Sequence, residues 1–198
     1  MNPSPTLGSA LCGSFCTFSQ SLQALRQLRE EYDRIIPIFS EAAGSWDTRF
    51  GKADDFIAEA EAICGHKAIL TIPQAEPIGP KKLLDLLIIA PCTGNTLAKL
   101  AAGIADSTVT LACKAHLRNR RPVVLAVSSN DALAGNAASL GRLLSRKHFY
   151  FVPFAQDSPI GKPDSLVADF PRLPAAVRGA LQGKQIQPVI FSHPVIPE

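Results

Sequence analysis

Residues 84–100 read LDLLIIAPCTGNTLAKL and set the fold class of the chain. Residues 84–90 are nearly all apolar, as in a strand that is buried on both faces of a parallel sheet. A turn of small polar residues follows, and residues 95–103 have the sequence of a helix. This order of strand, turn and helix predicts a β-α unit whose strand lies in the centre of a sheet.

Similar units recur on both sides of this segment. Apolar residues recur at helical spacing between Phe18 and Leu28, and Pro37 places the second strand at an edge or a strand end. Residues 73–80 contain three prolines and are expected to form a loop. Strands are expected at residues 7–12, 34–39, 67–72, 84–90, 122–127 and 148–152, and further helices at 52–64, 95–103, 107–119, 137–147 and, weakly, 173–181. The pattern predicts a three-layer α/β fold, a Rossmann-like (flavodoxin-like) parallel sheet with helices on both faces.

The length and composition predict a single domain over residues 1–198. Of the 198 residues, 46% are hydrophobic, and a chain of this length buries enough surface to fold without disulfides or structural metals. From about residue 155 the sequence becomes rich in proline and small polar residues, with an extended stretch at 185–191. We expect this C-terminal tail to pack on the domain or on a neighbouring subunit.

Charge and hydropathy exclude two classes of partner. Lys and Arg number 20 and Asp and Glu 17, a net charge of +3, far below the basic stripe of a nucleic-acid-binding protein. No apolar run reaches the roughly 18 residues of a membrane span, and no cation before Arg26 supplies the basic start of a signal peptide. We expect a cytoplasmic protein that binds neither nucleic acid nor membrane.

The cysteines predict neither a disulfide framework nor a metal site. Their number, five, is odd, and no CxxC pair occurs. Cys113 and His116 would share one face of a helix, but two ligands do not complete a metal site. We therefore expect a packed cysteine, a surface histidine and no bound metal.

Three predicted strand ends carry residues suited to a ligand. Ligands of parallel α/β sheets lie beyond the carboxyl ends of the strands, where backbone N–H groups attract anions. Gly13 and Ser14 follow the first strand, residues 91–96 (PCTGNT) follow the central strand, and residues 128–131 (SSND) follow the strand at 122–127. Together these three ends predict a pocket.

These residues also have structural interpretations. Gly13 and Ser14 match neither the GxGxxG nor the P-loop pattern and suit a simple helix cap. Thr93 and Asn95 are able to cap the following helix, although we favour side chains that point outward to the polar edge of a heterocycle. Cys92 is interpreted as a packed thiol, with a reactive thiol as the alternative.

The same segments resemble a known family, the homo-oligomeric flavin-containing cysteine decarboxylases, which include the flavin prenyltransferases. Gly13 and Ser14 match the TGS turn of the family, and Asn130 matches the asparagine of its PxMNxxM-type motif. Residues 90–107 (APCTGNTLAKLAAGIADS) match its PASANT-type segment and the helix after it. The resemblance covers most of the chain in order.

The resemblance implies a bound FMN and an obligate homo-oligomer. The FMN phosphate is expected near Gly13, Ser14 and Ser40, and Asn130 belongs to the same site. The isoalloxazine ring is expected near Pro91, Cys92, Thr93, Gly94 and Asn95. The oligomer is expected to be built from trimers, with the flavin near a subunit interface.

Two departures from the family pattern argue against a decarboxylase or prenyltransferase. Counting back from Asp85, Pro77 stands where the decarboxylases have their catalytic histidine. Leu133 replaces the methionine that follows the asparagine of the motif, and the only methionine of the chain is Met1. Decarboxylation of a cysteinyl substrate is therefore the least favoured function.

Further stretches resemble one branch of this family along the full length of the chain. They are residues 46–53 (WDTRFGKA), 71–80 (TIPQAEPIGP), 117–133 (LRNRRPVVLAVSSNDAL), 150–157 (YFVPFAQD) and 180–188 (ALQGKQIQP). Members of this branch are components of two-part synthases that oxidise a dihydropyridine dicarboxylate to pyridine-2,6-dicarboxylate in the mother cell of sporulating bacteria. The resemblance implies an oxidoreductase subunit with NADP as acceptor. Because this chain lacks a GxGxxG pattern, NADP is expected on the partner, the A subunit. The alternative is a non-catalytic substrate-binding or scaffolding subunit.

A dianionic substrate needs cations, and arginine binds carboxylates at two points. Arg49 and Lys52, in the loop after the second strand, are the candidates, with a solvated loop or helix start as the alternative interpretation. Arg118, Arg120 and Arg121 fall at the carboxyl end of a helix, where the dipole favours cations, so we expect a structural role or, less favoured, a subunit contact. We assign no chemistry to the three histidines at 66, 148 and 193.

Overall fold

The segment at residues 84–100 forms the central strand of the sheet and the helix that follows it. In the computed structural model, which describes residues 4–192, β3 (Leu86–Cys92) is buried along its whole length. Only Thr93 separates it from α5 (Gly94–Ala102). The predicted β-α unit is therefore confirmed.

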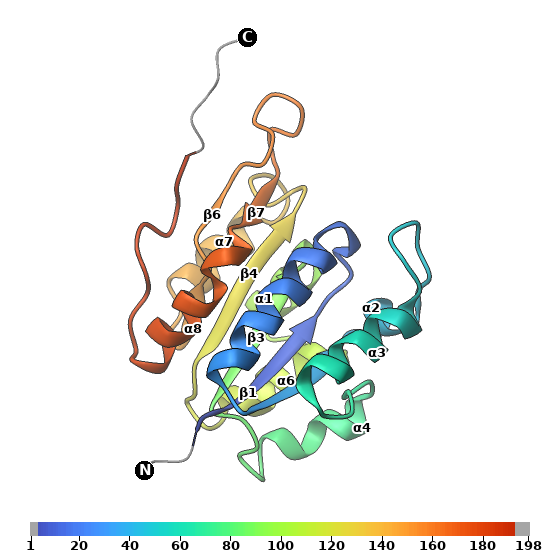
Figure 1. The fold of residues 1–198 in the computed structure, drawn as a ribbon. Coiled ribbons are helices and arrows are strands. Elements are labelled where there is room, and N and C mark those ends of the chain that lie inside the picture. Colours follow the sequence, from blue (N-terminus) through green and yellow to red (C-terminus); the bar gives the residue numbers. More distant parts are fainter. Residues whose placement is uncertain (1–3, 193–198) are drawn as a thin grey trace.

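The sheet has seven strands in the order β2-β1-β3-β4-β7-β6, and β5 also pairs with β4. The parallel part consists of β1 (Thr6–Leu11), β2 (Arg34–Phe39), β3, β4 (Val123–Ser129) and β5 (Phe149–Phe151). As Pro37 predicts, β2 lies at an edge of the sheet. The carboxyl ends of β1, β3 and β4 point to the same edge of the molecule (Figure 1).

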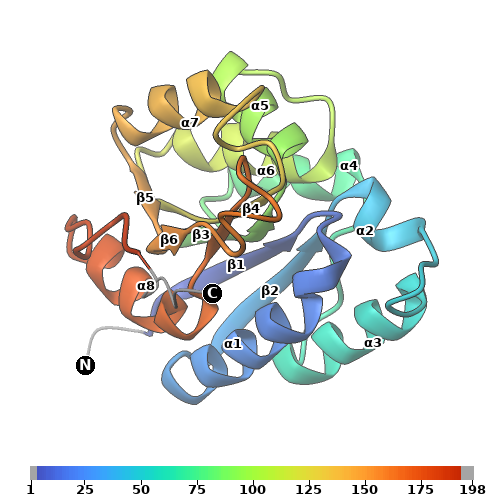
Figure 2. The ribbon, with the colours of Figure 1, turned by 90° about the horizontal axis from the view of Figure 1, so that it is seen from above.

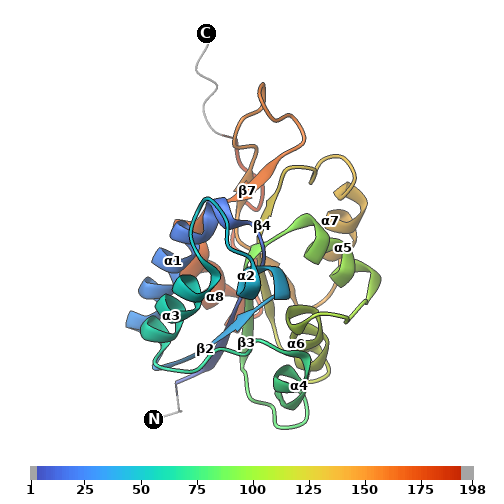
Figure 3. The same ribbon diagram turned by 90° about the vertical axis from the view of Figure 1, so that its right-hand side faces the viewer.

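Helices cover both faces of this sheet, as predicted (Figures 2 and 3). One layer consists of α1 (Phe18–Glu31), α3 (Ala53–Cys64) and α8 (Leu173–Leu181). The other consists of α4 (Ile72–Ala75), α5, α6 (Thr108–Leu117) and α7 (Ala137–Leu144). The short α2 (Glu41–Ser45) follows β2, and three 3-10 helices complete the described chain: η1 (Phe15–Thr17), η2 (Glu76–Ile78) and η3 (Phe170–Arg172).

Residues 67–80 differ from their prediction. The expected strand at 67–72 is reduced to one isolated parallel bridge between Ile69 and Ile38. The expected loop at 73–80 contains α4 and η2, because Thr71 and Gln74 form a reciprocal capping box that starts a helix. Pro73 lies in the first turn of that helix, where a missing N–H costs no hydrogen bond.

The C-terminal segment also contains structure that its composition did not predict. β6 (Phe154–Ala155) and β7 (Leu166–Ala168) add two antiparallel strands to the sheet, so the sheet is mixed rather than wholly parallel. β7 pairs with Ser128 and Ser129 at the end of β4. The extended stretch after α8 returns to the sheet through a bridge between Ile190 and Phe154.

One arginine of the basic cluster has a structural role. The guanidinium of Arg121 lies 3.2 Å from Asp85 Oδ1 and donates to the carbonyl oxygens of Lys82 and Leu84. Asp85 Oδ2 in turn accepts a hydrogen bond of 2.8 Å from the backbone N–H of Thr6. These contacts join the beginnings of β1 and β3 at the edge of the sheet opposite the predicted pocket.

The prediction that His116 lies at the surface is wrong, because its side chain is fully buried. It lies on the inner side of α6, and its Nε2 is 3.0 Å from the carbonyl oxygen of Pro122. Cys113 is buried on the same helix. Residues 4–192 contain no group of three or more potential metal ligands, and no helix among them is long and apolar enough to span a bilayer.

We predict that His116 makes folding stability fall in acid. Burial lowers its pKa to about 4, against the raising effect of the hydrogen bond to Pro122. Because the unfolded histidine has an ordinary pKa of about 6.5, the unfolded chain binds the extra proton. Stability is therefore complete above about pH 6.5 and falls toward pH 4, by on the order of 3 kcal/mol.

Urea unfolding of the wild type and of His116→Gln between pH 7 and pH 4 checks this prediction. The glutamine takes up no proton in this range, so the variant should lose less stability than the wild type as the pH falls. Parallel losses in the two proteins would contradict it.

Candidate functional site

A cavity of about 850 Å³ lies at the carboxyl ends of β1, β3 and β4. The segments after β1, β3 and β4, which the sequence analysis expected to form one pocket, all contribute to the wall of this cavity. Its lining residues are 13–16, 49–50, 93–95, 128–131, 136, 157, 162–165 and 167. The cavity therefore joins segments from nearly the whole chain.

Hydrogen bonds hold the strand ends together beneath this cavity. Ser14 Oγ, after β1, lies 2.8 Å from Ser128 Oγ near the end of β4. The backbone N–H of Cys12 donates to the carbonyl oxygen of Pro91, and the Ser21 hydroxyl of α1 donates to that of Ala90. The first helix is thereby fixed to the end of β3, and the Gly13–Ser14 turn faces the cavity.

Gly94 allows an unusually close approach between α5 and the loop after β4. A Cβ atom on Gly94 would lie 2.5 Å from Ser129 Oγ, 2.6 Å from Asn136 Nδ2 and 2.7 Å from Asp131 Oδ1. These side chains form one network, because Ser129 and Asn136 both donate to the Asp131 carboxylate. Gly94 thus sets the shape of the cavity wall in addition to lining it.

Thr93 and Asn95 differ in what their side chains do. Thr93 Oγ1 accepts a hydrogen bond of 3.3 Å from the backbone N–H of Thr96 and caps α5. The structure thus shows the capping role of Thr93, and Thr93 also lines the cavity. Asn95 is exposed and lines the cavity, and so does Asn130. Their amides supply donors and acceptors suited to the edge of a heterocycle.

Four predicted site residues do not line the cavity. Ser40 Oγ caps α2 by accepting from the backbone N–H of Ala43 at 3.3 Å. Lys52 occupies the N-cap position of α3. Pro91 and Cys92 are buried within β3.

The structure supports the packed interpretation of Cys92. Burial raises the pKa of its thiol well above the ordinary value, and the neighbouring Cys12 and Cys113 raise it further. The thiolate is the nucleophilic form of cysteine. Cys92 is therefore a packed, protonated thiol.

The loop between β6 and β7 is the part of the site that sequence reasoning missed. Lys162 lies 3.2 Å from Asp157 Oδ2, and both residues line the cavity. Burial alone would raise the pKa of Asp157, but hydrogen bonds from Ser165 and Lys162 lower it below the ordinary value. Asp157 is thus ionised and paired. No motif in this stretch marked it, because only the antiparallel strands bring the loop to the cavity.

The cavity wall contains three carboxylates, those of Asp131, Asp157 and Asp164, and two cations, of which only Arg49 is a candidate for holding an anion. Lys162 is paired with Asp157, and Asp131 is held by Ser129 and Asn136. The Arg49 guanidinium lies 4.8 Å from the centre of the Phe50 ring, and both residues line the cavity. Of the predicted pair of cations, therefore, the cavity includes Arg49 and not Lys52.

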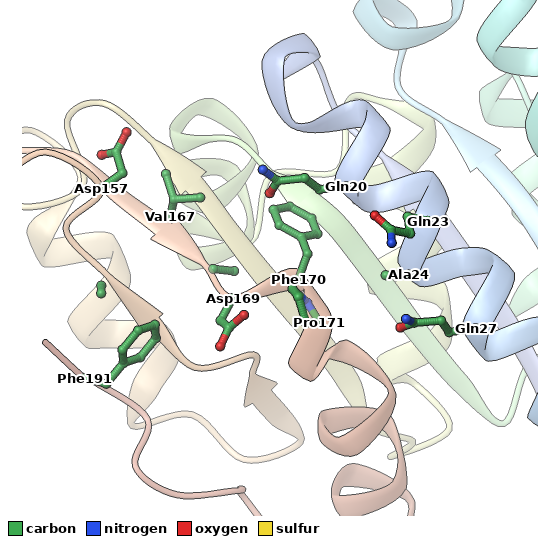
Figure 4. Close-up of a pocket in the computed structure, with 12 residues that line it drawn as sticks. Gln20, Gln23, Ala24, Gln27, Asp157, Val167, Asp169, Phe170, Pro171 and Phe191 are labelled. Atoms are coloured by element: carbon green, nitrogen blue, oxygen red, sulfur yellow. The ribbon is translucent and has the colours of Figure 1, made fainter. Parts of the chain in front are cut away.

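A second hollow, of about 430 Å³, lies between α1 and the C-terminal segment. Figure 4 shows Gln20, Gln23 and Gln27 of α1 along one side, with Phe170 and Phe191 on the other. The lining contains no arginine or lysine among the described residues. It is therefore a poorer candidate for a phosphate or dicarboxylate than the cavity at the strand ends.

The fold is that of a flavodoxin-like α/β protein with a cavity at the carboxyl ends of its strands, and comparison with known proteins agrees with this fold. The family model described as Flavoprotein matches residues 1–159, and the chain belongs to this family. The chain is 42% identical over 187 residues to the B subunit of dipicolinate synthase from Bacillus subtilis. The aligned residues cover 94% of each of the two chains. The resemblance to this branch is thereby confirmed.

Solved structures agree with this assignment. The B subunit of dipicolinate synthase from Bacillus halodurans has a TM-score of 0.88 and 39% identity, covering 97% of this chain and 99% of that one. AnUbiX, in complex with FMN and dimethylallyl pyrophosphate, has a TM-score of 0.60 and 19% identity, covering 76% and 78% of the two chains. The second likeness shows a shared fold.

We predict that Gly94→Ala destabilises the protein. The added methyl group enters space occupied by three hydrogen-bonded polar side chains, and overpacking of this kind costs about 1–3 kcal/mol. Gly141→Ala in α7 is the matched control, because its Cβ meets nothing within 4 Å. In a helix this change stabilises by roughly 0.5–1 kcal/mol. Denaturant unfolding of both variants measures the difference, and equal stabilities would contradict the prediction.

Proposed function

We propose that this chain is the B subunit of a dipicolinate synthase, which takes part with an A subunit in oxidising dihydrodipicolinate to dipicolinate. The observation that carries the proposal is the identity of 42% with such a protein over nearly the whole chain, combined with a cavity that Arg49 helps to line. In this proposal the protein acts in the mother cell of a sporulating bacterium. It forms a homo-oligomer built from trimers.

We infer that this cavity holds FMN, and several lining groups support the inference. At one wall are the Gly13–Ser14 turn and the hydroxyl groups of Ser14 and Ser128, which suit a phosphate. Asn95 and Asn130 supply amides, and the rings of Phe15 and Phe50 supply apolar surface for a flat ring system. A bound FMN would supply two-electron redox chemistry at this site.

The reaction removes two electrons and two protons from the dihydropyridine ring and makes it aromatic. A hydride equivalent passes finally to NADP⁺, and the remaining proton passes to water. In our proposal NADP binds to the A subunit, because this chain has no GxGxxG pattern. The residues of this chain bind and orient the dicarboxylate, with Arg49 contacting one carboxylate.

We expect the purified chain to take up FMN with Asn130 contributing to the affinity. Asn130→Ala should weaken binding by roughly threefold to tenfold, the effect of one lost hydrogen bond. Asn119→Ala is the control, since Asn119 donates to the carbonyl oxygen of Gly79, outside the cavity. Absorbance and fluorescence titration with FMN measures both. A wild type that takes up no flavin would contradict FMN binding.

A separate prediction concerns the substrate. Arg49→Ala should weaken binding of dipicolinate while leaving FMN affinity unchanged, because it removes a cation that lines the cavity. Lys52→Ala is the matched control, since Lys52 lies in the same loop and does not line the cavity. Calorimetric titration with dipicolinate checks it. Equal dipicolinate affinities in the two variants would contradict a role of Arg49 in substrate binding.

One observation favours a second candidate function, that of a non-catalytic substrate-binding or scaffolding subunit. Pro77, which stands at the position of the decarboxylase histidine, lies in η2 and is not among the residues that line the cavity. The family decarboxylation therefore lacks its acid-base group here. Bleaching of bound flavin by dihydrodipicolinate supports the redox role, and binding without bleaching supports the scaffold.

A further inference from the structure

A groove of about 330 Å³ runs between the end of α5, the outer side of α6 and the segment joining α7 to β5. Its apolar lining includes Leu100, Ile104, Leu117 and Phe149, of which Leu100 and Phe149 are buried. Ile104 is 47% exposed, so its side chain is open to contact with a partner. The helices that contribute to it belong to the layer on the face of the sheet opposite α1 and α8 (Figure 3).

Cations surround this apolar surface. Lys114 and Arg118 are four residues apart on α6, so they project from the same side of the helix. Arg146 completes the rim, and none of the described residues that line the groove is acidic. The nearby Asp106 is outside the lining and is paired with Lys99 at 2.9 Å.

Arg146 is held in place over the groove. Its Nη1 donates to the carbonyl oxygen of Leu100 at 3.2 Å, and its guanidinium lies 5.5 Å from the centre of the Phe149 ring. Arg142, one turn earlier, donates to the carbonyl oxygen of Ala101 at 3.3 Å. The two arginines satisfy the last carbonyl groups of α5, so the positive charge on this side is ordered before any partner arrives.

We propose that this groove binds an acidic segment with an apolar face on the A subunit of the synthase. The proposal rests on the proposed function, which requires a partner subunit. Charge complementarity selects the partner: carboxylates on its rim pair with Lys114, Arg118 and Arg146, and its apolar side chains cover Ile104 and Leu117.

A second copy of this chain fits the groove poorly. A two-fold contact through the same surface would place Lys114, Arg118 and Arg146 against identical cations, and like charges facing each other oppose association. A two-fold contact through this groove is therefore disfavoured, and a contact between unlike surfaces of two copies would appear as a changed oligomer mass of the double variant.

α5 connects the groove to the cavity. Its first residues line the cavity, and its last residues line the groove. A helix of nine residues is about 13 Å long. A partner in the groove is thus one short helix away from the flavin site, close enough for its own loops to extend over the cavity mouth.

The experiment measures the affinity between this chain, loaded with FMN, and the A subunit from the same bacterium by calorimetry at low and high salt. We expect the double variant Lys114→Glu and Arg118→Glu to weaken binding by at least about tenfold, and the wild-type affinity to fall as salt rises. Ile104→Ser should weaken it with the salt dependence unchanged. The matched control reverses two charges elsewhere, in the double variant Arg34→Glu and Lys184→Glu. Both residues are exposed cations, one on the edge strand β2 and one after α8.

Three results would overturn the proposal: no binding of the wild type to the A subunit, equal weakening in the control, or a changed oligomer mass of the double variant alone. Lys114 and Arg118 are exposed and lie outside the cavity, so the double variant should fold and bind FMN like the wild type. Circular dichroism and FMN titration check this. Failure of the proposed function is distinguishable. A chain that takes up no FMN yet binds the A subunit through the groove refutes flavin binding alone.

Discussion

The absence of a side chain at Gly94 is the constraint on which the cavity depends. It lets the first turn of α5 approach the loop after β4 until Ser129, Asp131 and Asn136 fill the space of a Cβ atom. The Asp131 carboxylate then orders this loop through two hydrogen bonds, and Asn130 beside it is held at the cavity wall. One backbone contact therefore fixes two of the three strand ends relative to each other.

The opposite edge of the sheet is fixed by charge instead of close packing. Arg121 joins the carboxylate of Asp85 to two backbone carbonyl groups, and Asp85 binds the first N–H of β1. Between these two edges β3 is buried on both faces and supplies the apolar centre. The ion pair at the starts of the strands is thus separated along the sheet from the residues that line the cavity at their carboxyl ends.

Much of this arrangement could be predicted from the sequence, because periodicity reports burial directly. The apolar run at 84–90, the glycine turn after β1 and Pro37 at the edge strand each have one simple structural meaning, and the structure agrees with them. The prediction of a strand at 67–72 was wrong, because the capping box of Thr71 and Gln74 starts a helix where the apolar alternation favoured a strand. His116 was placed at the surface because spacing on a helix does not show which side the sheet covers.

The loop of Asp157 and Lys162 was beyond prediction for a different reason. Its composition is that of any polar loop, and it reaches the cavity only because β7 pairs antiparallel with the last residues of β4. That pairing depends on two strands of two and three residues, too short to leave a periodic pattern. The C-terminal segment therefore contributes to the site through topology, and it adds a paired cation to a wall otherwise built by the strand ends. Because Lys162 is paired with Asp157, and Asp164 adds a further carboxylate to the lining, this loop brings no unpaired cation that competes with Arg49 for an anionic ligand.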